Sequence, residues 1–64
     1  MIIDKFPKSD MYQYRVEMDP KMYDAIMPWI IETGFKCSIW NDIIGTIVYI
    51  KNEQDLTFFL LRWS

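Results

Sequence analysis

Hydrophobic and polar residues alternate along three stretches of the chain, and this period of two is typical of β-strands with one buried face. The first stretch covers residues 11–18, and one of its faces carries Tyr12, Tyr14, Val16 and Met18. Residues 35–41 alternate in the same way. Residues 46–51 are β-branched and apolar on both faces, which is typical of a strand in the centre of a sheet. The pattern therefore predicts three strands, with residues 46–51 in the middle.

Residues 20–33 repeat apolar side chains at every third or fourth position, as one face of an amphipathic helix does. Asp19 is the expected N-cap, Pro20 the first helical residue and Gly34 the left-handed end. Pro28 lies inside the segment, where it removes one backbone hydrogen bond and crowds the preceding turn. We therefore expect a helix with a kink or a break at Pro28.

A second helix is predicted after the last strand. Asn52 is its expected N-cap, and Asp55 stands three residues further on, as in a capping box. Glu53 and Asp55 suit the positive end of the helix dipole, and Arg62 suits the negative end. The inner stripe of this helix is predicted to consist of Leu56, Phe59, Leu60 and Trp63. We expect Trp29 of the first helix to pack inside as well.

The order strand, helix, strand, strand, helix predicts an α+β fold of the βαββα type. A right-handed crossover between the first two strands gives a three-stranded antiparallel, split sheet in the order 1-3-2, with both helices on one face. This is a truncated ferredoxin-like unit that lacks its fourth strand. Residues 11–18 are then an open edge, which needs protection or a partner. Residues 1–10 show no periodicity and are predicted to be an N-terminal arm outside the domain, which spans residues 11–64.

The composition agrees with one small, densely packed domain. The chain has 64 residues, of which 52% are hydrophobic and 17% aromatic, so disorder is not the expected main state. Seven Lys and Arg residues against nine Asp and Glu residues give a net charge of −2. This balance argues against a generally basic, nucleic-acid-coating protein.

Most kinds of catalytic site are missing from the sequence. There is no histidine, and Cys37 has no second cysteine for a disulfide or a zinc site. Cys37 falls on the inner face of a predicted strand, where a thiol is an inert small hydrophobe. The acidic residues stand at helix starts and turns, and two glycines cannot form a phosphate-binding loop. We therefore expect no enzyme activity, no cofactor and no metal.

No membrane segment is expected, because no stretch approaches the roughly 18–20 apolar residues that span a bilayer. The first residues also lack the apolar core of a signal peptide. A cytoplasmic protein is the expectation that follows.

The outer face of the predicted sheet is the first candidate binding surface. It combines cations with aromatic side chains, namely Arg15, Lys36, Trp40, Tyr49 and Lys51. With Glu17 its net charge is +2, so it resembles a stacking platform for single-stranded nucleic acid. Aromatic and Arg side chains are also the usual anchors of protein interfaces. A third interpretation is a solvated sheet face in which the rings shield the backbone.

The flanks of the two helices are the second candidate surface. Phe58 and Leu61 lie beside the inner stripe of the last helix, and Met27 and Ile31 flank the first helix. Contiguous exposed apolar groups mark interfaces. Self-association through this flank, or across the edge of residues 11–18, would form a homodimer. The sequence leaves open whether the sheet face or the helix flank is the interface.

The segment of residues 51–63, KNEQDLTFFLLRW, resembles the ending of small accessory proteins of tailed bacteriophages. The resemblance covers thirteen of the 64 residues. It implies a viral accessory protein in a bacterial cytoplasm, with no catalytic residues to carry over. On this basis we expect a module that docks on a host protein and inhibits or redirects it. Binding of single-stranded nucleic acid through the open sheet face is the alternative.

Overall fold

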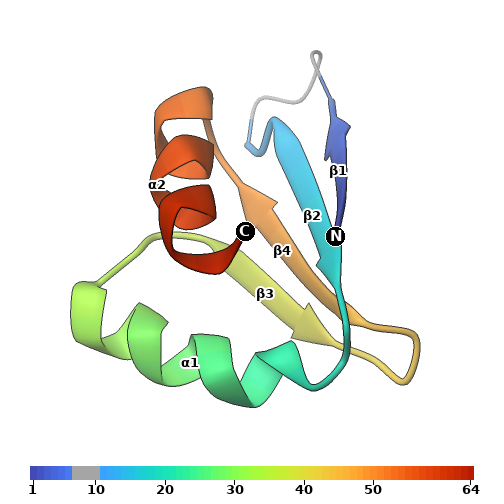
Figure 1. The fold of residues 1–64 in the computed structure, drawn as a ribbon. Coiled ribbons are helices and arrows are strands. Elements are labelled where there is room, and N and C mark those ends of the chain that lie inside the picture. The colour runs from blue at the N-terminus through green and yellow to red at the C-terminus, as the bar shows by residue number, and fades with distance from the viewer. Residues whose placement is uncertain (7–10) are drawn as a thin grey trace.

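The chain folds into one four-stranded antiparallel sheet with two helices, as a computed structural model that describes residues 1–6 and 11–64 shows (Figure 1). The strands lie in the order β1-β2-β4-β3. Their bounds are Ile2–Lys5 for β1, Tyr14–Met18 for β2, Ser38–Asn41 for β3 and Thr46–Ile50 for β4. The helices are Met22–Thr33, called α1, and Glu53–Trp63, called α2.

The three strands expected from the sequence are present, and β4 lies between β2 and β3 as predicted. Val48 of β4 is opposite Val16 on one side and Ile39 on the other. The apolar side chains of residues 46–50 therefore lie in the middle of the sheet, where both neighbours shield the backbone.

The prediction of three strands was wrong, because part of the expected arm forms a fourth. Residues 2–5 pair with β2 in antiparallel register, with Ile3 opposite Val16. The edge of β2 is therefore not open, and a homodimer cannot form by continuing the sheet from it. A ferredoxin-like unit would add its last strand after the second helix, whereas here the added strand precedes the domain. The remainder of the predicted arm, residues 7–10, lies outside the described residues.

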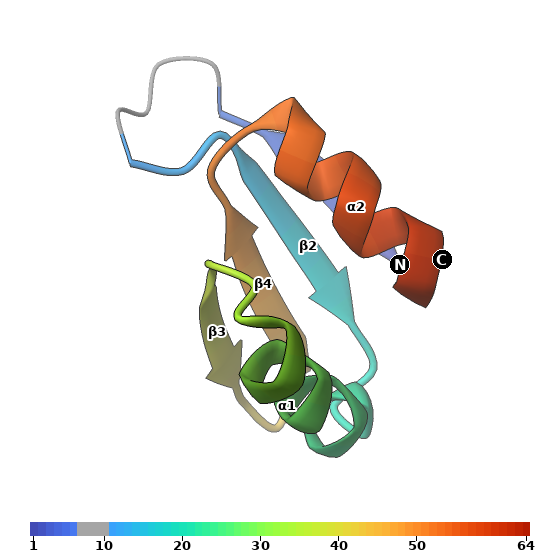
Figure 2. The ribbon, with the colours of Figure 1, turned by 90° about the vertical axis from the view of Figure 1, so that its left-hand side faces the viewer.

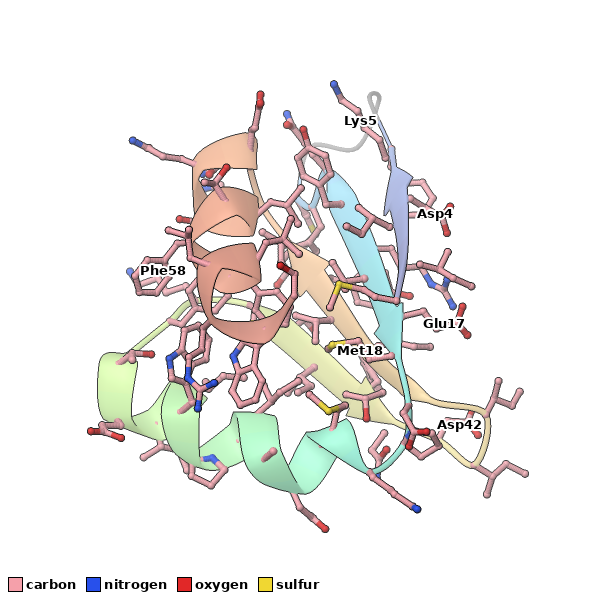
Figure 3. The ribbon with its side chains drawn as sticks, viewed as in Figure 1. Asp4, Lys5, Glu17, Met18, Asp42 and Phe58 are labelled. Atoms are coloured by element: carbon pink, nitrogen blue, oxygen red, sulfur yellow. The ribbon has the colours of Figure 1, made fainter. Side chains whose placement is uncertain are left out.

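Both helices cover the same face of the sheet, which is called the inner face below (Figure 2). Burial alternates along β2 and β4, so every second side chain enters the core. The core consists of Tyr14, Val16, Met18, Ile26, Val48, Ile50, Leu56 and Phe59. Figure 3 shows Met18 on the helix side of the sheet and Asp4 and Glu17 on the opposite side.

Tyr12 departs from the predicted alternation. It precedes β2, and its ring centroid lies 6.0 Å from that of Tyr49, a partly buried residue whose two neighbours in β4, Val48 and Ile50, point into the core. The alternation therefore begins at Tyr14 and not at residue 11.

Helix α1 begins later than predicted and runs through its proline. The Asp19 side chain accepts a hydrogen bond from the Lys21 amide at 2.9 Å, and the Asp19 carbonyl accepts one from Met22 at 3.0 Å. Asp19 thus closes a turn before the helix. The expected break at Pro28 is absent, because residues 22–33 form one helix. Gly34 ends it as predicted, with a φ of 70°.

Helix α2 begins as the sequence predicted. The side chain of Asn52 accepts a hydrogen bond from the Asp55 amide at 2.8 Å. Leu56 and Phe59 are buried, while Leu60 and Trp63 pack against the core with part of their surface exposed. The inner stripe of the helix is therefore the predicted one.

An aromatic cluster joins the two helices. The ring of Trp29 lies 5.2 to 6.0 Å from four other rings, which are those of Phe35, Phe58, Phe59 and Trp63. Trp29 and Trp63 are thus packing residues, as expected. Aromatic pairs in such tilted and edge-to-face arrangements stabilise a structure by about 0.5–1.5 kcal/mol beyond their buried area.

Two adjacent phenylalanines allow a matched test of this core. Phe59 is completely buried, whereas half of Phe58 is exposed. Phe59→Ala should lower the free energy of unfolding by about 3–5 kcal/mol, because it leaves a cavity. Phe58→Ala should lower it by about 1–2 kcal/mol, because water already reaches the ring. Urea unfolding followed by circular dichroism measures both, and equal losses would contradict the packing described here.

Removal of residues 1–6 tests the role of β1. The truncated chain should be less stable and should associate, because the backbone groups of β2 lose their partners and become a template for another strand. Light scattering over a range of concentrations measures the association, with the full chain as control. A truncated chain that stays monomeric and equally stable would show that β1 does not protect this edge.

Candidate functional site

The face of the sheet opposite the helices is the principal candidate surface, and it is called the outer face below. The strand register arranges its side chains in two rows across the sheet. One row consists of Ile2, Glu17, Ile47 and Trp40, and the other of Asp4, Arg15, Tyr49 and Ser38. Both helices pack against the other face, so neither covers these rows, and the ring of Tyr12 lies beside that of Tyr49.

Trp40 is the largest exposed group on the outer face. Its side chain is 63% exposed, and its direct neighbour across the strands, Ile47, is partly buried. At the other end of the same row, Ile2 of β1 is also exposed. The prediction that Trp40 points away from the core is therefore confirmed.

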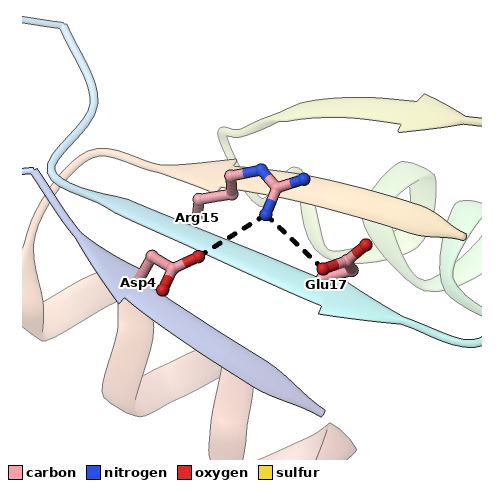
Figure 4. Close-up of polar contacts among 3 residues, drawn as sticks. All are labelled: Asp4, Arg15 and Glu17. Carbon is pink, nitrogen blue, oxygen red and sulfur yellow. Dashed lines mark hydrogen bonds and ion pairs between the residues drawn. The ribbon is translucent and has the colours of Figure 1, made fainter.

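Arg15 is held between two carboxylates in the middle of the outer face (Figure 4). Its Nη1 lies 3.5 Å from Asp4 Oδ2 and 3.5 Å from Glu17 Oε2. A side-chain hydrogen bond with Tyr49 is the main cause that raises the pKa of Arg15, and both carboxylates add to it against a smaller opposing effect of desolvation. Arg15 is thus engaged within the sheet and is not a free cation.

The charge expected for the outer face changes as a result. Asp4 belongs to β1, which the sequence analysis treated as an arm, and it joins Glu17 beside Arg15. These three residues together carry a charge of −1. The centre of the outer face is therefore weakly acidic, and Asp4 lowers the net charge of the predicted surface from +2 to +1.

Lys36 and Lys51 line a hollow at the end of the sheet near the start of α2. The hollow has a volume of about 680 Å³ and is called the end groove below. Its walls include Tyr12, Phe35, Lys36, Cys37, Lys51 and Asp55. Of the three predicted cations, Arg15 is paired with carboxylates within the sheet, and both lysines line the end groove.

The two flank residues predicted on α2, Phe58 and Leu61, lie in different surroundings. Phe58 is half exposed, but its ring stacks on Trp29 at 5.7 Å and on Phe35 at 5.8 Å, so it belongs to the aromatic cluster. Leu61 is 82% exposed and Ile31 is 76% exposed. Of the two flank residues predicted on α2, Leu61 is the more exposed apolar group.

The tip of the β3–β4 hairpin, residues 42–45, carries two exposed isoleucines that the sequence analysis did not select. Ile43 is 95% exposed and Ile44 is 74% exposed. Asp42 and Gly45 exchange backbone hydrogen bonds of 3.0 and 3.2 Å, and the Asp42 side chain accepts one from Ile44 at 3.4 Å. Turns normally hold Gly, Asn, Asp or Ser. Two isoleucines between Asp42 and Gly45, which are residues typical of turns, were therefore the signal that could have identified this feature.

Gly45 fixes how the hairpin tip lies against β2. A Cβ atom at this position would stand 2.7 Å from the carbonyl oxygen of Met18. Only glycine permits this close approach of two backbones. The tip is therefore held by its own hydrogen bonds and by β2, and it presents its two isoleucines on a stable support.

Two further features bear on chemistry and on membranes. Among the described residues, no three or more Cys, Asp or Glu side chains come together as a metal ion would need. Cys37 is partly buried, and burial raises the pKa of its thiol to about 11, so it is a poor nucleophile at neutral pH.

Neither helix in the described part of the chain has the length and apolar character needed to cross a membrane.

Comparisons of the chain with protein-family models, with curated proteins and with solved structures found no match.

The thiol of Cys37 makes the stability depend on alkaline pH. The unfolded chain loses this proton around pH 9.0, and the folded chain keeps it until about 11. The folded state therefore binds more protons in this interval, and the free energy of unfolding falls as the pH rises through it. Denaturant unfolding at several pH values should show a steeper fall for the native sequence than for Cys37→Ala. The same slope in both proteins would contradict the assignment.

Proposed function

We propose that this protein is a non-enzymatic binding module whose docking surface is the outer face together with the hairpin tip. The observation that carries the proposal is the placement of Trp40, Ile43 and Ile44 at one corner of a sheet face that no described element covers. Trp40 and its neighbour Ile47 stand two positions before and after the four-residue tip. The exposed apolar side chains therefore belong to one region of the surface.

The energetics of such a surface favour a protein partner. Large apolar groups left in water on a small domain are typical of interfaces. A buried Trp anchor alone contributes about 2 kcal/mol or more to many complexes. The hydrogen bonds of the hairpin tip hold Ile43 and Ile44 in place before binding, so little conformational entropy is lost when they are covered.

The alternative, single-stranded nucleic acid on the outer face, has less support. Arg15 is paired with Asp4 and Glu17, and these three residues carry a net negative charge. Phosphate binding depends on cations that can replace the counterions of the nucleic acid. Lys36 and Lys51 lie in the end groove and not beside the exposed Trp40.

The class of partner that we propose follows from the resemblance of residues 51–63 to the ending of phage accessory proteins. It is a protein of a bacterial host, met in the cytoplasm, which the bound module inhibits or redirects. The acidic centre of the outer face suits a partner with basic groups around an apolar pocket.

Capture from a nuclease-treated bacterial lysate tests the proposal. The native protein should retain one partner in stoichiometric amount, and Trp40→Ser should reduce the recovery at least tenfold, as expected for an anchor worth about 2 kcal/mol. Ile43→Ser should weaken capture in the same direction. Quantitative mass spectrometry measures the recovered protein, and circular dichroism verifies that each variant is folded.

Ile31→Ser is the control, because Ile31 is also a largely exposed isoleucine but lies on α1. It should leave capture unchanged. If Leu61→Ser abolishes capture while Trp40→Ser retains it, the interface is the helix flank and the proposal is wrong. A partner that is recovered from an untreated lysate but lost from the nuclease-treated lysate would instead favour the nucleic-acid alternative.

A further inference from the structure

The end groove has the dimensions of a ligand site and adjoins the outer face where Tyr12 lies beside Tyr49. Its volume of about 680 Å³ falls within the range of about 300–1,000 Å³ that is typical of small-molecule sites. Four parts of the chain meet there: the segment before β2, the segment before β3, the end of β4 and the first turn of α2. We propose that the end groove binds a small aromatic anion, with one or two rings and a carboxylate or sulfonate group.

The apolar part of the end groove suits a flat ring. Tyr12 and Phe35 contribute aromatic side chains to its walls, and Cys37 contributes a small, soft one. Phe35 is positioned by the aromatic cluster, since its ring lies 5.2 Å from that of Trp29. Aromatic walls held in this way favour stacked or edge-on contacts with a second ring system.

The charges of the end groove suit a negative group. Lys36 and Lys51 are both exposed, and neither forms an ion pair with a described residue. Among the described residues on the walls, Asp55 is the single acidic group, so these residues carry a charge of +1 in a protein of net charge −2. Burial keeps the Cys37 thiol neutral at physiological pH, so it adds no repulsion. An anion is therefore attracted here, whereas Asp4 and Glu17 make the outer face unfavourable for it.

Two fluorescent probes that differ only in charge test this inference. Anilinonaphthalene sulfonate is an aromatic anion, and phenylnaphthylamine is the same ring system without the sulfonate. The sulfonate should bind the native protein at one saturable site. In the double variant Lys36→Gln/Lys51→Gln the affinity for the sulfonate should fall about tenfold, since each exposed pair of a lysine with the sulfonate contributes a factor of roughly three. The neutral probe should bind both proteins alike.

Lys21→Gln is the control variant, because Lys21 is an exposed lysine at the start of α1, remote in sequence from the residues of the end groove. It should leave the affinity for the sulfonate within about twofold of the native value. Raising the salt concentration from about 50 to about 500 mM should weaken the binding of the anionic probe, because the charges become screened. The binding of the neutral probe should not change.

The position of the probe is measured separately by amide NMR. Shifts on addition of the sulfonate should concentrate at Phe35, Cys37 and Asn52. Shifts at Trp40 and Ile43 would place the probe on the docking surface and overturn the inference, as would equal affinities of the native and double-variant proteins or the absence of saturation. If Trp40→Ser loses partner capture but binds the probe normally, the end groove and the docking surface are two independent sites.

Discussion

The side-chain alternation of β2 and β4 is the constraint on which the structure depends. Each strand sends every second residue into one core, and Val16 and Val48 stand opposite each other at its centre with no exposed surface. Two helices of eleven and twelve residues are enough to cover one face of the sheet. The other face remains in water, and a shift of the register by one residue would exchange the two.

This division explains why the docking surface that we propose lies on the outer face. The inner face is occupied by packing, since Ile26, Leu56 and Phe59 fill the space under the helices. The outer face is left with side chains that the core does not need, and it has been stabilised in two ways. β1 protects one edge by backbone pairing, and the carboxylates of Asp4 and Glu17 hold Arg15 in place. At the other end of the face Trp40 is 63% exposed, and exposed apolar groups of this kind are typical of interfaces.

Local signals predicted most of the elements correctly. The cap at Asn52, the left-handed Gly34 and the central position of residues 46–50 each depend on interactions within a few residues or on one strong pattern. The prediction failed at β1 because Ile2 and Ile3 are too few to show a period. Their strand exists through its pairing with β2, which is not encoded locally. The break expected at Pro28 is absent because packing of the residues on either side maintains the helix.

The sequence by itself determined which residues enter the core, where α2 begins and that Trp40 points to solvent, because alternation and capping are properties of neighbouring residues. The tertiary structure decided that Asp4 and Glu17 lie beside Arg15 and that Lys36 and Lys51 line the end groove. It also decided that Phe58 belongs to an aromatic cluster with Trp29. These outcomes depend on contacts between residues distant in the chain, and no local pattern specifies which carboxylate or ring will lie beside a given side chain.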